Sequence, residues 1–339
     1  MPRNDGRDDF MKNIREILKN RILVLDGAMG TMIQRHQLTE EDFRGERFKN
    51  HPCSLKGNND LLSITRPDII KSIHAEYFAA GADIAETNSF GGTWVAQDDY
   101  ELAAAVYDIN YQSAKIAKEV ADEFTAKEPN KPRFVAGSMG PTTKLASMSP
   151  DVNDPGFRNI SFDELVDAFK EQASGLIDGG ADLLLVETIT DTLNAKAALF
   201  AIDEVQQEKG TDLPIMISGT ITDASGRTLS GQNTEAFVIA VEHSKPLSIG
   251  LNCALGAEAL RPYLKTIKEK SSCLVSAHPN AGLPNEMGAY DESPEFMAKQ
   301  IKVFLDEGLV NIIGGCCGTT PAHIKAIADL ASTYSPKNN

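Results

Sequence analysis

Three cysteines stand where thiol chemistry is expected. Cys253 follows the aliphatic stretch 248–251, and the adjacent pair Cys316 and Cys317 follows the stretch 311–313. Adjacent cysteines make a poor disulfide, because the eight-membered ring strains the peptide between them. Glycines flank the pair and let the backbone turn both sulfurs toward one ion. Three thiolates without a fourth cysteine or an obvious histidine are typical of a zinc site with an open position, as catalytic sites have.

The charge of such a site indicates which reaction it suits. Zinc bound by three thiolates is already anionic, and a substrate thiolate would add a further negative charge. Zinc lowers the pKa of a thiol, so the substrate sulfur would be ionised at neutral pH. The excess of negative charge keeps that sulfur electron-rich, whereas it would acidify a bound water poorly. The site therefore favours nucleophilic attack by a substrate thiol over hydrolysis.

The fourth position of the zinc site has one candidate in the sequence. A purely structural zinc normally takes four protein ligands. Asn280 follows the stretch 274–276, and its amide oxygen could bind the ion until a substrate thiol displaces it. The alternative is that Asn280 only forms a turn.

We expect Cys273 to be a small core residue and Cys53 to be a loop residue.

Polar residues that end other strands could recognise an amino acid. Asp26 and Glu187 could each bind an ammonium group, and the backbone amides of residues 27–31, beginning at Gly27 and Ala28, could hold a carboxylate in a nest-like turn. The alternative role for any one of them is a helix cap or a turn. Further polar groups expected at the same place are Glu86, Thr87, Asn88, Ser138 and Asn252.

The elements that must position these residues alternate regularly along the chain. Short aliphatic stretches, each ending in Gly, Asn, Asp, Thr or Cys, are followed by amphipathic stretches of helix length, which predicts a parallel sheet covered by helices. The predicted strands are 22–25, 83–85, 134–136, 183–186, 215–217, 248–251, 274–276 and 311–313. The predicted helices are 67–80, 98–124, 161–178, 192–209, 234–243, 258–270, 295–307 and 321–331.

This alternation predicts a (β/α)₈ barrel, in which the active site lies at the carboxyl ends of the strands. A doubly wound open sheet is the rival, but it predicts a Gly-x-Gly-x-x-Gly turn after the first strand, and that turn reads Asp26-Gly-Ala-Met-Gly-Thr31. We expect an extension at 1–20 with one helix (Phe10, Ile14, Ile17 and Leu18 on a face), one barrel domain at 21–335 and a tail at 336–339. The long connection 31–66 is expected to serve as a lid or a site wall.

Composition narrows the partners and the compartment. The formal charge of −15 disfavours nucleic acid and anionic membranes, since both require compensating Lys and Arg. No stretch approaches the roughly 20 apolar residues of a membrane span, and the polar start lacks a secretory signal. Five cysteines, an odd number, favour reduced thiols or metal ligands in the cytoplasm over a disulfide framework.

These residues carry a family resemblance. The chain resembles the N-terminal homocysteine-binding module of cobalamin-dependent methionine synthases, a branch of the homocysteine S-methyltransferase family. The matching motifs are Leu25-Asp-Gly-Ala-Met-Gly-Thr-Met-Ile-Gln34, Asp42-Phe-Arg-Gly-Glu-Arg47, Leu55-Lys-Gly-Asn-Asn-Asp60, Glu86-Thr-Asn88, Gly250-Leu-Asn-Cys253 and Gly314-Gly-Cys-Cys-Gly-Thr-Thr-Pro321. The resemblance implies a (β/α)₈ barrel with zinc on Cys253, Cys316 and Cys317 and homocysteine as the methyl acceptor.

The resemblance also raises the question of the methyl donor. Proteins of this branch usually continue into folate- and cobalamin-binding modules, and this sequence has no Asp-x-His-x-x-Gly cobalamin motif. We expect methylcobalamin bound outside this chain, on modules that act in trans or have been deleted. One alternative is a homocysteine methyltransferase that uses betaine or S-methylmethionine directly. Another is a non-catalytic module that binds zinc or homocysteine.

Overall fold

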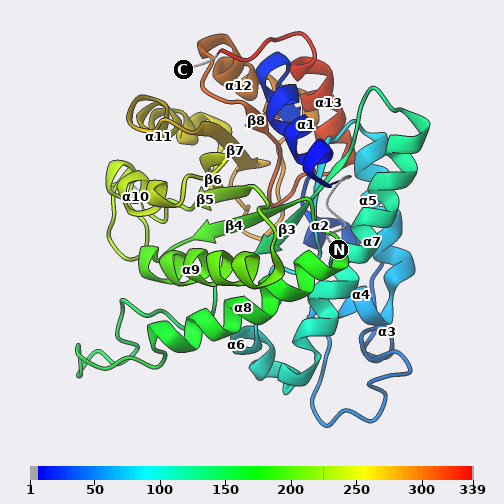
Figure 1. Ribbon diagram of the computed structural model, residues 1–339, viewed down its shortest axis with the longest axis vertical. Coiled ribbons are helices and arrows are strands. Elements are labelled where there is room, and N and C mark those ends of the chain that lie inside the picture. The colour runs from blue at the N-terminus through cyan, green and yellow to red at the C-terminus, as the bar shows by residue number, and fades with distance from the viewer. Residues whose placement is uncertain (1–6, 224, 338–339) are drawn as a thin grey trace.

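The aliphatic stretches of the sequence lie side by side in one sheet (Figure 1). The structure is a computed structural model that describes residues 7–223 and 225–337, with side chains from residue 14 onward. Within these residues the strands are β1 (Leu23–Val24), β2 (Ile84–Glu86), β3 (Phe134–Met139), β4 (Leu183–Ile189), β5 (Ile215–Gly219), β6 (Ser248–Gly256), β7 (Leu274–Asn280) and β8 (Ile312–Ile313). Every strand predicted from the sequence is therefore confirmed.

The sheet curls into a nearly closed barrel. Its order is β1-β8-β7-β6-β5-β4-β3-β2, and every paired neighbour is parallel. Only one isolated parallel bridge, Leu25 to Ile84, joins β1 to β2 in the described part of the chain. The backbone hydrogen bond from Asp83 N to Val24 O (2.7 Å) and that from Asp26 N to Ile84 O (2.9 Å) flank this bridge. The prediction of a (β/α)₈ barrel is confirmed.

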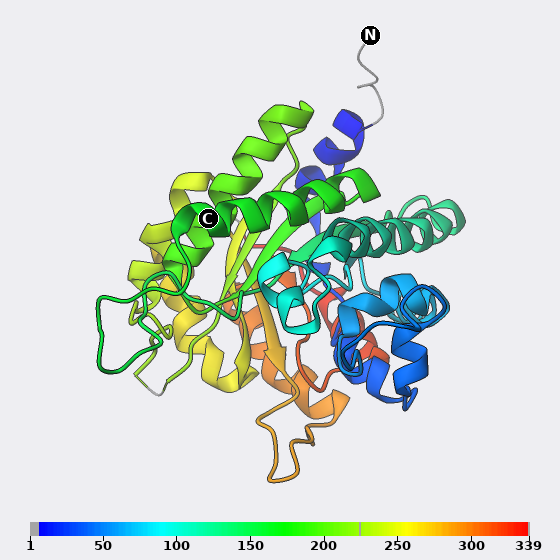
Figure 2. The same ribbon diagram turned by 90° about the horizontal axis from the view of Figure 1, so that it is seen from below.

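Helices surround the strands (Figures 1 and 2). The covering helices are α5 (Pro67–Ala79), α7 (Val106–Lys127), α8 (Phe162–Gly179), α9 (Thr192–Lys209), α10 (Thr234–Val241), α11 (Ala257–Lys270), α12 (Pro294–Glu307) and α13 (Pro321–Ala331). Local chemistry fixes their ends. Ser161 and Glu164 form a capping box at the start of α8, and Gly180 ends it at a φ of 100°. Not one of the described helices is long and apolar enough to cross a membrane.

Two predicted segments differ from the structure. The helix predicted at 98–124 is wrong at its start, because Glu101 adopts a φ of 53° and interrupts it; α6 (Trp94–Gln97), η2 (Asp98–Tyr100) and η3 (Ala103–Ala105) precede α7. The connection 31–66 is not a plain loop. It holds the end of α2 (Met29–Gln34), then α3 (Glu40–Arg44), η1 (Asn59–Leu61) and α4 (Leu62–Thr65). Elsewhere in the chain, one further short helix, η4 (Glu242–Ser244), follows α10.

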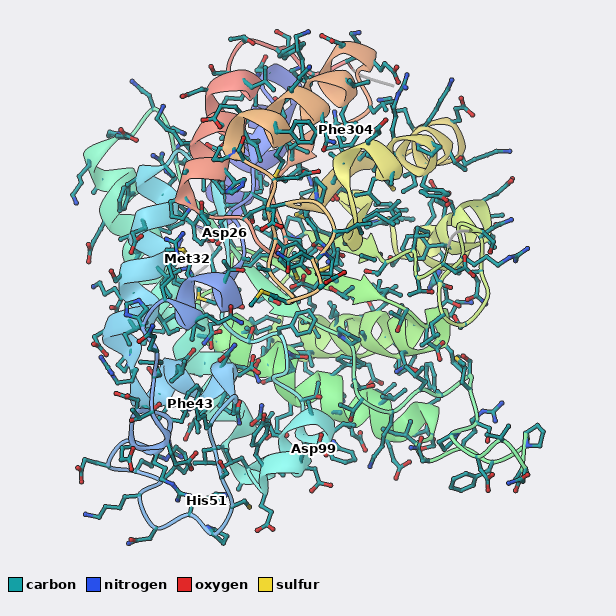
Figure 3. All side chains as sticks on the ribbon, turned by 180° about the vertical axis from the view of Figure 1, so that it is seen from behind. Asp26, Met32, Phe43, His51, Asp99 and Phe304 are labelled. Atoms are coloured by element: carbon teal, nitrogen blue, oxygen red, sulfur yellow. The ribbon has the colours of Figure 1, made fainter. Side chains whose placement is uncertain are left out.

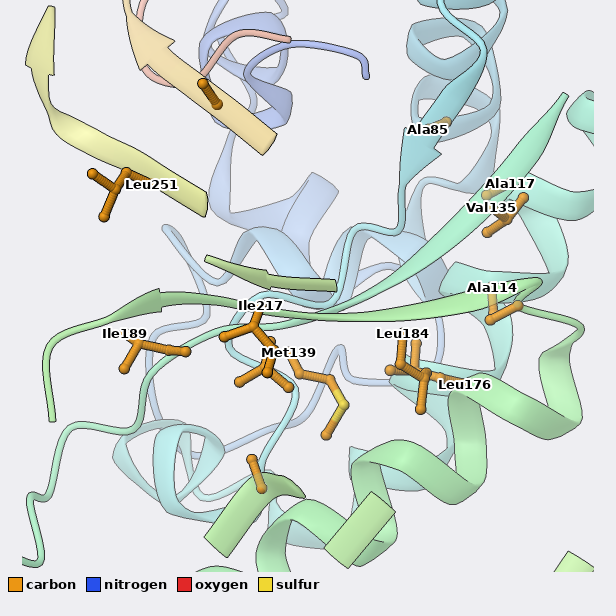
Figure 4. Close-up of a cluster of buried hydrophobic side chains, with 14 of the residues drawn as sticks. Ala85, Ala114, Ala117, Val135, Met139, Leu176, Leu184, Ile189, Ile217 and Leu251 are labelled. Carbon is orange, nitrogen blue, oxygen red and sulfur yellow. The ribbon is translucent and has the colours of Figure 1, made fainter. Parts of the chain in front are cut away.

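The apolar core has two parts. Between the sheet and the helices, Leu176 of α8 packs with Leu184 of β4 and their neighbours (Figure 4). Inside the barrel lies a smaller cluster that includes Leu25, Phe134, Leu185 and Met216. The N-terminal helix α1 (Arg7–Asn20) adds Ile14 and Leu18 to this inner cluster, each at most 2% exposed. The side chain of Phe10, predicted on the same face, lies outside the described residues.

Candidate active site

The three predicted metal-binding cysteines meet at the carboxyl end of the barrel. Cys253 lies on β6, and Cys316 and Cys317 lie in the turn after β8. Backbone hydrogen bonds dock that turn on β7, from Cys316 N to Pro279 O (2.9 Å) and from Ala281 N to Cys317 O (3.0 Å). The three Sγ atoms lie within 4.8 Å of one another, and no other group of three possible ligands among the described His, Cys, Asp and Glu residues does so.

A β-bulge places Cys253 in the cluster. Asn252 pairs with His278 and Gly256 with Asn280, so β6 fits four residue steps into the space of two on β7. Cys253 and Ala254 take positive φ angles of 57° and 56°. Non-glycine residues in this region cost about 1–3 kcal/mol each and persist only where the surroundings hold them. The two backbone conformations therefore lower the stability of the fold, and they direct the Cys253 sulfur toward the other two sulfurs.

The donor set fits a thiophilic metal ion. The Sγ of Cys253 lies 2.7 Å from that of Cys316 and 3.5 Å from that of Cys317. All three cysteines are free thiols that are neither fully buried nor fully exposed. Soft sulfur donors arranged around one point select zinc and similar ions over magnesium or calcium.

Without a metal, the three sulfurs share one negative charge. Hydrogen bonds from Cys253 and Cys316 lower the pKa of Cys317 to about 3. Donating hydrogen bonds to Cys253 and Cys317 raises the pKa of Cys316 well above its usual range. A hydrogen bond from Cys316 lowers the pKa of Cys253, but its bond to Cys317 and its burial outweigh this and raise it to about 12. One thiolate held by two thiols is an electron-rich centre ready for a cation.

A cluster of carboxyl groups lies beside the sulfurs. Burial raises the pKa of Asp26 and of Glu86 well above the usual range, and repulsion from Glu187 adds to both shifts. Burial, together with repulsion from Cys317, raises the pKa of Glu187 to about 7, despite a hydrogen bond from Ser138 that lowers it. Within the described residues no Lys, Arg or His forms an ion pair with these three carboxyls. Such a cluster is complementary to a cationic group of a ligand.

The three cysteines, Glu86 and Glu187 border one cavity of about 700 Å³, whereas Asp26 is not among its lining residues. Asp26 lies near the middle of the molecule, whereas His51 of the 31–66 segment lies at its edge (Figure 3). Gly27 can only be glycine here, because a Cβ would lie within 3.0 Å of the Tyr77 ring and the Thr319 hydroxyl. The cavity is lined by Gly27, Ala28, Met29, Gly30, Thr31, Gln34, Gly57, Asn59, Asp60, Glu86, Thr87, Asn88, Phe90, Ser138, Glu187, Thr188, Asn252, Cys253, His278, Gly288, Ala289, Tyr290, Gly315, Cys316, Cys317, Gly318 and Thr320.

The predicted polar residues come together, with differing surroundings. Glu187, Ser138, Thr87, Gly27 and Ala28 line the cavity. The Thr87 hydroxyl is held within the fold, because it accepts a hydrogen bond from Ser138 N (2.9 Å) and contacts Ser89 Oγ (2.6 Å).

Two further predicted residues are buried at the carboxyl ends of β7 and β1. Asn280 is 2% exposed, and its Oδ1 has no hydrogen-bond partner among the described residues. Asp26 Oδ1 is also unpartnered, whereas its Oδ2 accepts a hydrogen bond from Glu86 N (3.1 Å). Both oxygens therefore lack a partner within the described residues, and neither residue lines the cavity.

The sequence reasoning missed several residues of the cavity. His278 is 1% exposed, its two ring nitrogens have no partner in the described part of the chain, and burial lowers its pKa to about 3. Strand alternation from Asn280 could have identified it, because residues two apart share a face. Tyr290 lines the cavity and forms a hydrogen bond with Cys317. It belongs to a Gly- and Asn-rich segment, and nothing in the local pattern marks its position.

The two remaining cysteines lie away from the cluster. Cys273 directly precedes β7, at the opposite end of the strand from Asn280, and is partly buried. Cys53 lies in the segment between α3 and η1, where its sulfur is 3.8 Å from His51 Nε2. Neither residue is part of the sulfur group around Cys253.

The fold and the cavity define a class of protein: a (β/α)₈ barrel with a potential thiolate metal centre at the carboxyl ends of its strands. A family model described as homocysteine S-methyltransferase matches residues 23–331. The chain therefore belongs to the homocysteine S-methyltransferase family, and this membership supports methylation of homocysteine as its activity.

Solved structures agree on the fold. The metallated form of the homocysteine methyltransferase MmuM from Escherichia coli is 23% identical, with a TM-score of 0.71 over 93% of this chain and 99% of that one. The oxidized form of MmuM is 22% identical, with a TM-score of 0.68 over 91% and 95% of the two chains. The apo form is 22% identical, with a TM-score of 0.66 over 93% and 97%. At these identities the likeness establishes the shared fold.

Proposed function

We propose that this chain binds homocysteine and activates its thiol on zinc for transfer of a methyl group from methylcobalamin, giving methionine and cob(I)alamin. One observation carries the proposal: three cysteine sulfurs and two carboxyls of the uncompensated cluster, those of Glu86 and Glu187, border the same cavity. Homocysteine carries the two complementary groups, a thiol for the metal and an ammonium for the carboxyls. Its third group, a carboxylate, would reach the backbone amides of residues 27–31 on the same cavity wall.

The zinc would be held by Cys253, Cys316 and Cys317. When bound, zinc supplies Lewis acidity that lowers the pKa of a thiol substrate, so that a thiolate nucleophile is present at neutral pH. The three cysteine thiolates keep the centre anionic and the substrate sulfur electron-rich. Asn280 would be the fourth donor in the absence of substrate, because its Oδ1 is buried and unpartnered among the described residues.

The carboxyl cluster would orient the substrate. An ammonium group placed among Asp26, Glu86 and Glu187 lowers the pKa of each, because an opposite charge favours the ionised form. This fixes the amino end of homocysteine and leaves its sulfur facing the cysteines. Thr87, Ser138 and Asn252 would complete the polar wall that bounds the substrate.

The methyl donor would come from outside this chain. We propose methylcobalamin on cobalamin- and folate-binding modules that act in trans or belong to a longer protein. We also propose residues 21–335 as one barrel domain, with 1–20 as an extension and 336–339 as a tail. Thiols that must stay reduced suit a cytoplasmic location.

The test is methionine formation from homocysteine and methylcobalamin by the zinc-loaded protein. Cys316→Ala serves as the control for the metal site, and Cys273→Ala as the matched control for loss of a cysteine elsewhere. We expect turnover in the wild type and in Cys273→Ala, and none in Cys316→Ala. A wild-type protein that binds one zinc and homocysteine but makes no methionine would refute transfer from free methylcobalamin, and the same assay with methylcobalamin on its binding module would then decide whether methylcobalamin is the donor.

A second candidate donor is a small methylated cation such as betaine or S-methylmethionine. Phe90 and Tyr290 both line the cavity and could face such a cation, since methylated cations favour aromatic faces. Methionine formation with either compound, and none with methylcobalamin, would support this donor. Tight homocysteine binding without turnover by any donor would instead indicate a non-catalytic binding module.

A further inference from the structure

Two strained turns face each other across β5. On β4, Val186 pairs with Ile217 and Ile189 with Gly219, so β4 has one more residue than β5 in this step. Thr188 lies in that bulge and adopts a φ of 53°. The bulge of β6 that carries Cys253 lies on the other side of β5. One bulge therefore presents Glu187 to the cavity, and the other presents a sulfur.

The side chain of Asn252 connects the two turns. Its Oδ1 accepts hydrogen bonds from Thr188 N (3.0 Å) and from Ser218 Oγ (2.7 Å). Its Nδ2 donates to Thr188 Oγ1 (2.8 Å) and lies 3.9 Å from Cys316 Sγ. Its backbone oxygen accepts a hydrogen bond from Thr220 Oγ1 (3.0 Å). Asn252 is 1% exposed, so these contacts are shielded from water.

This pattern leaves Asn252 with little capacity for a ligand. Its amide oxygen has two lone pairs, and both are used by Thr188 N and Ser218. One of its two N–H groups is used by Thr188, and the other faces Cys316. Asn252 borders the cavity, but its hydrogen bonds go to the protein, so it acts on a substrate by holding its neighbours in place.

We propose that Asn252 is a positioning residue that fixes the distance between the carboxyl cluster and the sulfur cluster, and thereby selects a thiol amino acid of the length of homocysteine. The inference rests on the proposed function. If Asn252 is lost, Thr188 and Cys253 can relax out of their positive φ angles, which non-glycine residues avoid. The spacing between the carboxyl cluster and the sulfurs then becomes variable. Cysteine, one methylene shorter than homocysteine, would gain relative to homocysteine.

The test compares homocysteine with cysteine on the zinc-loaded protein by isothermal titration calorimetry. For Asn252→Ala we expect homocysteine affinity to fall about 10-fold while cysteine affinity changes less than 3-fold. Ser218→Ala removes one of the same hydrogen bonds from a residue that does not line the cavity. It should shift the ratio of the two affinities in the same direction and by less.

Asn194→Ala is the matched control. Asn194 is also a buried asparagine, 6% exposed, with hydrogen bonds to Thr142 Oγ1 (3.0 Å), Lys144 O (2.9 Å) and Ala146 N (2.9 Å), and it does not line this cavity. We expect it to lower stability and leave the affinity ratio unchanged.

Cobalt in place of zinc provides a second measurement. The visible spectrum of the substrate-free cobalt protein should stay that of a three-thiolate site in Asn252→Ala, because the ligands themselves remain. The spectrum with homocysteine should broaden, because the sulfur is less well placed. A ratio of homocysteine to cysteine affinity that is unchanged in Asn252→Ala would overturn the proposal. A wild-type protein that binds neither thiol would refute the proposed function, and the positioning role with it.

Discussion

Replacing Glu187 by glutamine should remove a pH-dependent cost from folding. Glu187 is 5% exposed, and its pKa of about 7 lies about 2.5 units above the ordinary value of 4.5. Between these values the folded protein keeps a proton that the unfolded chain has lost, so stability falls as pH rises. At 1.36 kcal/mol per unit, the loss attributable to Glu187 amounts to about 3 kcal/mol. Glutamine keeps an acceptor for Ser138 and cannot ionise.

Denaturant unfolding of the metal-free, reduced protein at pH 4.5 and pH 7.5 measures this loss. The wild type should lose about 3 kcal/mol more unfolding free energy across that range than Glu187→Gln. Ionisation of Asp26 and Glu86 adds to the slope of both proteins, and the difference between the slopes contains the ionisation of Glu187 together with its repulsion of these two carboxyls. Equal slopes would show that Glu187 ionises in the folded protein at its ordinary pKa, and would refute the argument from burial.

Further outcomes follow from the same site. Cys317→Ala should lower bound zinc from one per chain to below about 0.1, whereas Cys273→Ala should retain it; plasma mass spectrometry with circular dichroism as a check on folding decides this. Homocysteine affinity should rise about 10-fold from pH 6 to pH 8, because Glu187 must ionise to hold the ammonium. Calorimetry should show a smaller rise in Glu187→Gln, and a rise equal to that of the wild type would contradict this role of Glu187. Asn280→Ala should change the visible spectrum of the substrate-free cobalt protein and not that of the homocysteine complex; an unchanged resting spectrum would exclude Asn280 as a ligand.

The sequence predicts the start of each strand better than its end. The aliphatic stretches mark where β4 and β6 begin, because those residues fill the apolar core, between sheet and helices and inside the barrel. Their ends contain polar residues such as Glu187, Thr188 and Cys253, which lack the apolar pattern of a buried strand. The bulges that contain these residues depend on hydrogen bonds from a neighbouring strand. Local sequence does not contain that information.

Within the site, residue type was more informative than local pattern. The convergence of Cys253, Cys316 and Cys317 could be predicted, because a barrel brings the carboxyl ends of its strands to one face. Tyr290 could not, because it reaches Cys317 from a segment whose path is set by tertiary contacts. The break at Glu101 could not be predicted for a related reason. Its left-handed backbone conformation is usually signalled by glycine, and this position is a glutamate.

The seam where β1 meets β2 and closes the barrel provides a way to detect ligand binding. Asp26 belongs to the carboxyl cluster and also helps to join β1 to β2, because its Oδ2 accepts a hydrogen bond from the backbone amide of Glu86 across that seam. Its free Oδ1 could receive a cation without releasing this bond. A cation there would hold the carboxylate in place, and the closure of the barrel would become less prone to opening. Exchange of the Glu86 amide with deuterium would then slow, so this exchange rate would report whether a cation is bound beside Asp26.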